Sequence, residues 1–254
     1  TTFFIKGCPL HCLWCQNPES QSFKQDINFI KFKCIHCGEC RKVCPEIGED
    51  LMIDSAACNL CGKCITACPV EARKYIGMKY SPQMVLDVAL KEKVFYDASG
   101  GGVTFSGGEC MASAGFLQEA LKLLKEADIH TVIDTCGYAC WENFEKVLPY
   151  TDLFLYDIKV IDDARHKEYT GVSNEMIFSN LKRLCDLGKK CIIRIPLIPG
   201  CTDSMEDIIH IGHFITDVLE NRIVRAELLP YNKIGESKYG NSTIFRDGGV
   251  GPYT

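Results

Sequence analysis

Eleven cysteines stand in three groups near the start of the chain, and thiolates are ligands for zinc and for iron–sulfur clusters. The groups are Cys8, Cys12 and Cys15; Cys34, Cys37, Cys40 and Cys44; and Cys58, Cys61, Cys64 and Cys68. The chain has 17 cysteines, an odd number that cannot all pair. Because the chain is also far longer than most disulfide-rich secreted domains, the grouping indicates metal binding rather than disulfides.

The second and third groups repeat one pattern, C-x2-C-x2-C-x3-C-P, as CIHCGECRKVCP and CNLCGKCITACP. This is the spacing of bacterial ferredoxins with two [4Fe–4S] clusters, in which the fourth cysteine of each run binds the other cluster. The expected ligand sets are Cys34, Cys37, Cys40 and Cys68 for one cluster, and Cys58, Cys61, Cys64 and Cys44 for the other. The alternative is a pair of structural zinc sites, for which separated C-x2-C pairs are more typical.

The first group, C-x3-C-x2-C, offers only three thiolates. Its spacing is weak by itself, but the strand-like run Thr2–Ile5 leads through Gly7 directly into it. A cluster with three protein ligands keeps one iron open for a small molecule, as catalytic metal sites do. The alternative is a set of core cysteines, which the polar neighbours His11 and Gln16 disfavour.

Beyond residue 75 the sequence alternates between strand and helix patterns. With Thr2–Ile5, the strand candidates are Val103–Ser106, His130–Asp134, Leu153–Ile158, Cys191–Pro196 and Ala226–Leu229. Ser81 before Pro82 predicts the start of a helix that runs to about Phe95. Ser204 with Asp207 predicts another helix start. This alternation predicts parallel βα units.

Residues that can do chemistry gather where these strands end, which is where parallel sheets place their active sites. They are Cys8 to Cys15, Gly107, Gly108, Glu109, Asp134, Asp157 and Lys159. Taken singly, several have ordinary explanations: a turn at Gly107–Glu109, a helix N-cap at Asp134, and a surface ion pair at Arg194. Their convergence therefore carries more weight than any one motif.

Composition excludes several classes of protein. The 254 residues carry a net charge of −5, which does not favour nucleic acid as a partner. No run of about 18 apolar residues predicts a membrane span, and the first residues show no signal peptide. We expect a cytoplasmic enzyme. Because the chain begins inside a strand, we also expect residues ahead of Thr1; the stretch from Lys238 to Thr254 gives no structural prediction.

Several motifs occur in a fixed order around the two-cluster repeat: GCPLHCLWCQNPES, SGGGVTFSGGE, IDTCGY, YDIK, TGVSNE, RIPLIPG and LLPYNKIGESKY. From Thr1 to about Tyr239 the chain resembles the activating enzymes of glycyl radical enzymes, in the radical S-adenosylmethionine superfamily. The resemblance implies an α/β fold, a partial (β/α)6 barrel formed by residues 1–28 and 76–254. A ferredoxin-like insert with two [4Fe–4S] clusters would occupy residues 29–75.

The resemblance also implies roles for individual residues. Cys8, Cys12 and Cys15 would hold a third, catalytic [4Fe–4S] cluster, whose open iron binds the methionine part of S-adenosylmethionine. Gly107 and Gly108 would let the backbone approach that ligand. Glu109 would accept a hydrogen bond from its ammonium group.

Four further positions match the family near the same ligand. Asp134 and Asp157 would lie beside S-adenosylmethionine and a monovalent cation, and Lys159 and Arg194 near the ligand's carboxylate. Asn232 stands where the family usually has histidine, and an amide can still bond a ribose. Cys110 replaces the usual proline after SGGE. We interpret Cys136 and Cys140 as buried small residues.

The implied activity is reductive cleavage of S-adenosylmethionine to a 5′-deoxyadenosyl radical, which removes hydrogen from a backbone glycine of a glycyl radical enzyme. A flavodoxin or ferredoxin would donate the electron. The insert is typical of activating enzymes for dehydratases, lyases and decarboxylases. Two alternatives remain: a radical enzyme acting on a small molecule, and an electron-transfer protein of the ferredoxin type.

Overall fold

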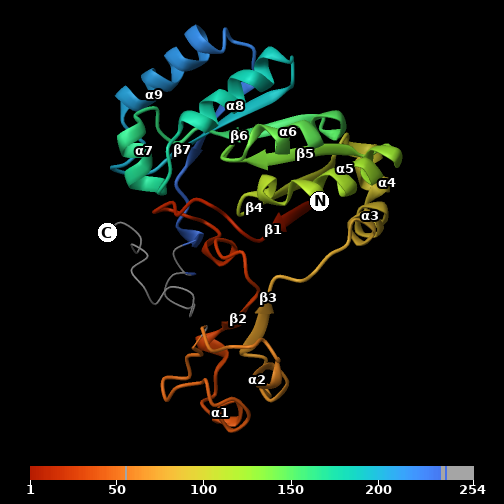
Figure 1. The fold of residues 1–254 in the computed structure, drawn as a ribbon, viewed down its shortest axis with the longest axis vertical. Helices are drawn as coiled ribbons and strands as arrows, with labels where there is room; N and C mark the ends of the chain where they lie inside the picture. Colours follow the sequence, from red (N-terminus) through yellow and green to blue (C-terminus); the bar gives the residue numbers. More distant parts are fainter. Residues whose placement is uncertain (55, 236–237, 239–254) are drawn as a thin grey trace.

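A six-stranded sheet organises the larger part of the molecule (Figure 1). The computed structural model describes residues 1–54, 56–235 and 238. The strands are β1 (Thr2–Ile5), β4 (Gly102–Gly107), β5 (His130–Thr135), β6 (Leu153–Asp157), β7 (Cys191–Leu197) and β8 (Arg225–Pro230). They lie in that order and every neighbouring pair is parallel. All six expected strands are confirmed, and β1 and β8 form the two edges of an open sheet.

Helices that connect the strands cover one face of this sheet. They are α3 (Pro82–Lys91), α4 (Lys93–Ser99), α5 (Ala114–Glu126), α6 (Trp141–Val147), α7 (Asp163–Thr170), α8 (Glu175–Asp186) and α9 (Met205–His213). The interface is apolar: Leu117 and Leu121 of α5 are fully buried, as are Phe105, Ile133 and Phe154 of the sheet. Burial of these side chains is the main force that fixes the strand order.

The helix starts agree with the sequence, but one helix end does not. The Ser81 hydroxyl accepts from the Met84 N–H at 3.2 Å, and Ser204 accepts from the Asp207 N–H at 3.1 Å. The helix expected to reach Phe95 is interrupted at Glu92, whose N–H turns to the Ala89 carbonyl in a tighter bond. No helix in the described ranges has the length and apolar character required to cross a bilayer.

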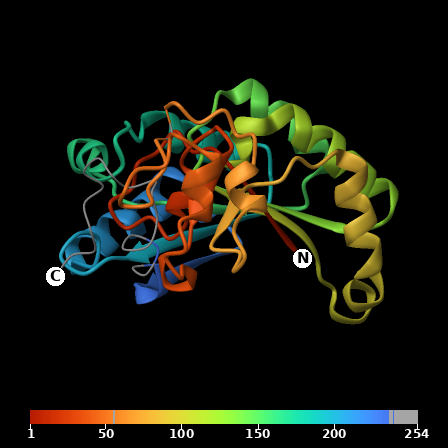
Figure 2. The same cartoon turned by 90° about the horizontal axis from the view of Figure 1, so that it is seen from below.

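The cysteine-rich segment forms a smaller unit below the sheet (Figures 1 and 2). Its antiparallel strands β2 (Asp26–Phe29) and β3 (Arg73–Ile76) carry the chain out and back, and α1 (Glu39–Val43) and α2 (Lys63–Thr66) lie beyond them. This strand pair spans the expected domain boundaries at 28/29 and 75/76. A small core that includes Ile27 and Phe29 packs against several of the cysteines.

We predict that the β4–β5 packing tolerates no side chain at Gly102. A Cβ there would lie 2.0 Å from the His130 carbonyl oxygen, so Gly102→Ala should reduce the free energy of unfolding by about 1–3 kcal/mol. The control is Gly115→Ala in α5, where a Cβ meets nothing within 4 Å and should stabilise the helix by about 0.5–1 kcal/mol. Anaerobic urea unfolding measures both; shifts of equal size and sign would contradict this packing.

Candidate functional site

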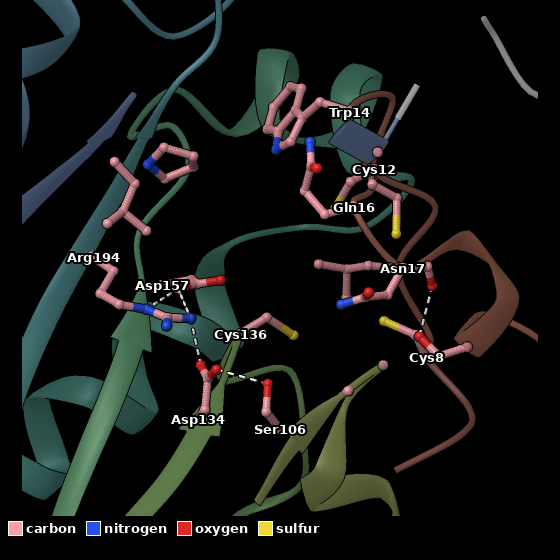
Figure 3. Close-up of a pocket in the computed structure, with 18 of the residues that line it drawn as sticks. Cys8, Cys12, Trp14, Gln16, Asn17, Ser106, Asp134, Cys136, Asp157 and Arg194 are labelled. Atoms are coloured by element: carbon pink, nitrogen blue, oxygen red, sulfur yellow. Dashed lines mark hydrogen bonds and ion pairs between the residues drawn. The ribbon is translucent and has the colours of Figure 1, made fainter. Parts of the chain in front are cut away.

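A cavity of about 740 Å³ opens at the carboxyl ends of the parallel strands (Figure 3). Ten residues named from the sequence line it: Cys8, Cys12, Cys15, Gly107, Gly108, Asp134, Asp157, Lys159, Arg194 and Asn232. They come from the loops after β1 and β8, from the ends of β4, β5 and β6, and from the middle of β7. The sheet therefore brings the predicted residues together, with Glu109 as the exception.

The loop with the first three cysteines is fastened to the end of α7. The His11 N–H donates to the Thr170 carbonyl at 2.8 Å, and the Leu13 N–H donates to the Tyr169 carbonyl at 3.0 Å. These two bonds stand on either side of Cys12 and fix its direction toward the cavity. The position of the cysteine loop thus depends on an element more than 150 residues further along the chain.

The three cysteines are partly buried, and this changes the acidity of their thiols. Burial raises the pKa of Cys8 to about 11 and that of Cys12 to about 12, and it raises the pKa of Cys15 as well. At neutral pH the thiols are therefore protonated, and a metal group must displace their protons on binding. The charge of Lys159 works against the rise at all three sites.

This donor set fits an iron–sulfur cluster better than a single ion. No three His, Cys, Asp or Glu side chains of the described residues converge in the way the ligands of one metal ion do. A [4Fe–4S] cluster instead binds each thiolate at a different iron, so its cysteines stay apart. Three thiols facing one cavity, with room beside them, meet that requirement.

Arg194 joins two carboxylates at the floor of the cavity (Figure 3). Its Nε and Nη2 donate to Oδ1 of Asp157 at 3.0 and 2.9 Å, and Nη2 also donates to Oδ1 of Asp134. The other Asp134 oxygen accepts from the Ser106 hydroxyl at 2.7 Å. Lys159 Nζ donates to the second Asp157 oxygen at 3.1 Å. Asp134 is therefore no helix cap, and the ion pair of Arg194 is internal rather than on the surface.

The two carboxylates differ in acidity. Burial raises the pKa of Asp134 to about 6, and the neighbouring charge of Asp157 adds to this rise. Burial acts on Asp157 too, but the cations Lys159 and Arg194 outweigh it and lower the pKa of that carboxyl. Both carboxylates are thus largely anionic at neutral pH, and Lys159 and Arg194 balance their charge while presenting two cationic side chains to an anionic group of a ligand.

Glu109 does not line the cavity, although its partners Thr135 and Cys136 do. Its carboxylate is fully buried and accepts from the Met111 N–H at 2.9 Å, the Thr135 hydroxyl at 2.7 Å and the Cys136 N–H at 2.8 Å. Glu109 therefore braces the loop after β4 against the end of β5. The predicted hydrogen bond from a ligand's ammonium group to this carboxylate stays a prediction.

Gly107 and Gly108 are required by the chain's own packing. A Cβ at Gly107, where φ is 120°, would lie 2.3 Å from the backbone nitrogen and oxygen of Ile5. A Cβ at Gly108 would lie 2.3 Å from the Gly7 carbonyl oxygen. The two glycines therefore allow the loop after β4 to pack closely against the end of β1. The expected close approach of this backbone to a ligand stays a prediction.

Several residues of the site were not named as site residues from the sequence, and Ser106, Trp14 and Lys238 are among them. Ser106 and Trp14 line the cavity and stand next to Gly107 and Cys15, so adjacency to the motifs was an available signal. Lys238 belongs to the motif LLPYNKIGESKY, so membership of that motif was the available signal. Its Nζ donates to the Gln16 carbonyl at 2.8 Å and to side-chain oxygens of Asn17 and Glu19 at 2.9 and 2.7 Å.

The scattered cysteines near the site behave differently from one another. Cys136 is buried, as expected, but it also lines the cavity. Cys140 is exposed, so the expectation of a buried residue was wrong: it precedes α6 at the surface. Cys110, in place of the family's proline, is fully buried, and its thiol donates to the Asp134 carbonyl at 3.3 Å.

The eight cysteines of the smaller unit fall into two sets. Cys34, Cys37, Cys40 and Cys68 line a cavity of about 20 Å³. Cys44, Cys58 and Cys61 all lie close enough to Cys64 for their charges to raise its pKa, in addition to the larger effect of burial. Cys68 of the second run thus shares a cavity with three cysteines of the first run; the two ligand sets stay a prediction.

The two cysteine runs of the smaller unit have the same backbone conformation. Gly38 and Gly62 each have φ of 75°, the left-handed region that favours glycine. In each repeat the N–H two residues after the first cysteine donates to that cysteine's Sγ at 3.4 Å. Such N–H···S bonds are among the interactions that set the reduction potential of iron–sulfur clusters.

We predict that Glu109→Gln destabilises the fold. Each carboxylate oxygen accepts from a backbone N–H, of Met111 or Cys136, so an amide group must place a donor against a donor in either orientation. The cost should be about 1–3 kcal/mol in the free energy of unfolding. The exposed Glu126→Gln is the control and should change it by less than about 0.5 kcal/mol. Equal stability of the two variants would refute the bracing role.

Comparison with known proteins gives consistent matches. The family model of the radical SAM superfamily matches residues 2–211. The trans-4-hydroxy-L-proline dehydratase activating enzyme of Clostridioides difficile is 42% identical over 245 residues, which cover 94% of this chain and 81% of that protein. The choline trimethylamine-lyase activating enzyme of Oleidesulfovibrio alaskensis is 40% identical over 248 residues, 94% of this chain and 80% of that protein.

A solved structure agrees on the fold. SuiB of Streptococcus suis, bound to the precursor peptide SuiA, superposes with a TM-score of 0.58 over 96% of this chain and 40% of SuiB. The two sequences are 16% identical, so this likeness concerns the fold alone.

Proposed function

The chain belongs to the radical SAM superfamily and, within it, to the activating enzymes of glycyl radical enzymes, and we propose that its partner is a dehydratase, lyase or decarboxylase. The observation that carries the proposal is the convergence of Cys8, Cys12 and Cys15 with Asp157, Lys159 and Arg194 on one cavity. Cys8, Cys12 and Cys15 would hold a [4Fe–4S] cluster, which would supply the electron for reductive cleavage of S-adenosylmethionine to methionine and the 5′-deoxyadenosyl radical that takes hydrogen from the partner's glycine.

The chain's own residues bind and orient S-adenosylmethionine. Lys159 and Arg194 supply positive charge for the methionine carboxylate, and Asp157 keeps both cations in place. Asp134, whose second oxygen is held by Ser106, belongs to the same wall and to the expected site of a monovalent cation. Asn232 lines the cavity and offers an amide to a ribose hydroxyl.

The open side of the sheet supports a polypeptide as the substrate. The edge strands β1 and β8 do not pair with each other in the described sheet. Phe4 of β1 and Leu229 of β8 line the cavity and remain 64% and 36% exposed, and Leu228 is 49% exposed. An apolar entrance of this kind fits a loop of a folded partner, and glycine, which has no side chain, can approach a radical most closely.

We assign the smaller unit, residues 29–75, to two further [4Fe–4S] clusters, which makes three in all. The grouping of its eight thiols and the paired N–H···S bonds support this assignment. Its role is to accept electrons from a flavodoxin or ferredoxin. Reduced clusters and glycyl radicals react with oxygen, so we place the activity in an anaerobic cytoplasm.

Sequence identity does not select one partner. Relatives named as activating enzymes for hydroxyproline dehydratase, choline lyase and isethionate lyase are 42%, 40% and 41% identical to this chain. The proposal therefore names the class of partner and leaves the metabolite of that partner open.

Iron content and S-adenosylmethionine cleavage test the cluster assignment together. The reconstituted chain should hold about twelve iron atoms, and the Cys8/Cys12/Cys15→Ala variant about eight. The variant should form no 5′-deoxyadenosine after reduction, because only the first group of thiols lines the cavity. Cys140→Ala, at an exposed cysteine outside the three groups, is the control and should retain both properties. Cleavage by the triple variant would refute the assignment.

A further inference from the structure

Arg73 is a buried cation with no carboxylate partner among the described residues. It begins β3, opposite Phe29 of β2, and is only 1% exposed. Its Nη2 donates to the Leu51 carbonyl, and its guanidinium lies 4.6 Å from the centre of the Phe29 ring. Nη1 has no hydrogen-bond partner, and no ion pair of Arg73 exists within the part of the chain that the structure describes.

An arrangement of this kind is unfavourable unless something else compensates the charge. Burial of an unpaired ion costs several kcal/mol, and a buried donor without an acceptor adds to that cost. One carbonyl and one aromatic ring satisfy only part of a guanidinium, which has five N–H donors. The position of Arg73 indicates what completes it, because Arg73 lines the same small cavity as Cys34, Cys37, Cys40 and Cys68.

We infer that Arg73 is the counter-cation of the cluster held by these four cysteines, donating from Nη1 to one of its sulfurs and raising its reduction potential. The inference rests on the proposed assignment of clusters to residues 29–75. A cluster with four thiolate ligands is an anion and becomes more negative on reduction. A fixed positive charge beside it therefore stabilises the reduced form more than the oxidised form.

Only one of the two cysteine runs is followed by a buried cation. Arg73 stands five residues after Cys68, the last cysteine of the second run. The equivalent position in the first run, five residues after Cys44, is Glu49, which is exposed to solvent. One cluster site thus receives a buried cation and the other does not, so we expect two auxiliary clusters of unequal potential.

The charge of Arg73 also extends to the second set, with a smaller effect. Cys64 of the second set stands only four residues before Cys68 of the first set, and Coulomb energy falls off gradually with distance. Arg73 does not line a cavity with the second set in the described structure, in contrast to its place beside the first. Its removal should therefore move both potentials in the same direction, and that of the first cluster further.

The test is a redox titration followed by electron paramagnetic resonance. The full-length Cys8/Cys12/Cys15→Ala chain, reconstituted anaerobically, is the parent, so that only auxiliary clusters contribute to the signal. Arg73→Met should shift one midpoint potential clearly to more negative values and the other less. Arg73→Lys keeps the charge without the planar fork and should give a smaller shift. The exposed neighbour Lys74→Met is the matched control and should change neither potential measurably.

The outcomes separate the inference from its premise. A parent with far fewer than about eight iron atoms would overturn the cluster assignment itself. A parent and an Arg73→Met variant with equal iron content and equal potentials, or a shift to more positive values, would overturn the role of Arg73 alone. A purely structural role would lower stability without moving the potentials.

A second measurement covers the case in which Arg73→Met does not assemble clusters. In the parent carrying Arg41→Lys, labelled with ¹⁵N-arginine, one reduced auxiliary cluster should show a ¹⁵N hyperfine coupling from the guanidinium. The Arg41→Lys change removes the other arginine of the insert, which lies exposed on α1. No coupling at either cluster would contradict the proposed hydrogen bond.

Discussion

Arg194 can bond Asp134 and Asp157 together because the register of the parallel strands β5, β6 and β7 brings the middle of β7 beside the ends of β5 and β6. Asp157 stands directly opposite Arg194 in the β6–β7 register, and Asp134 lies one strand further along. Two carboxylates this close would repel each other, and the guanidinium between them makes the arrangement stable. The rest of the cavity depends on this contact, because Lys159 and Ser106 are held by the same two carboxylates.

Around that charged floor, backbone contacts position the loops that would hold the cofactors. The Gly108 N–H donates to the Ile5 carbonyl at 2.8 Å, and the Glu109 N–H donates to Gly7 at 2.8 Å, which joins the β4 loop to the origin of the cysteine loop. Lys238 fastens the far side of that loop. Reactive chemistry in such enzymes belongs to the cofactor, and the protein contributes orientation and exclusion of water. The hydrogen bonds that hold the cysteine loop in place agree with this orienting role of the protein.

The sequence predicted the elements and the convergence of the site, and it did so for physical reasons. Alternating strand and helix patterns imply parallel strands, and their carboxyl ends must then meet, which is why Asp134 and Asp157 could be grouped. The local sequence did not predict which way each side chain points. Glu109 belongs to the motif but turns inward, because three donors from β5 and its own loop surround it. The roles of Lys238 and Arg73 arise from contacts between distant segments, which no local pattern encodes.

Transfer of hydrogen from a partner's glycine to 5′-deoxyadenosine is the central claim. The direct test uses a glycyl radical enzyme encoded beside this chain's gene, prepared with deuterium at the α-carbons of its glycines. The reduced, reconstituted chain is incubated with it and S-adenosylmethionine under anaerobic conditions. The account predicts deuterium in the 5′-deoxyadenosine and a glycyl radical signal in electron paramagnetic resonance. Cleavage without deuterium transfer from any such partner, while a small metabolite does donate hydrogen, would contradict it.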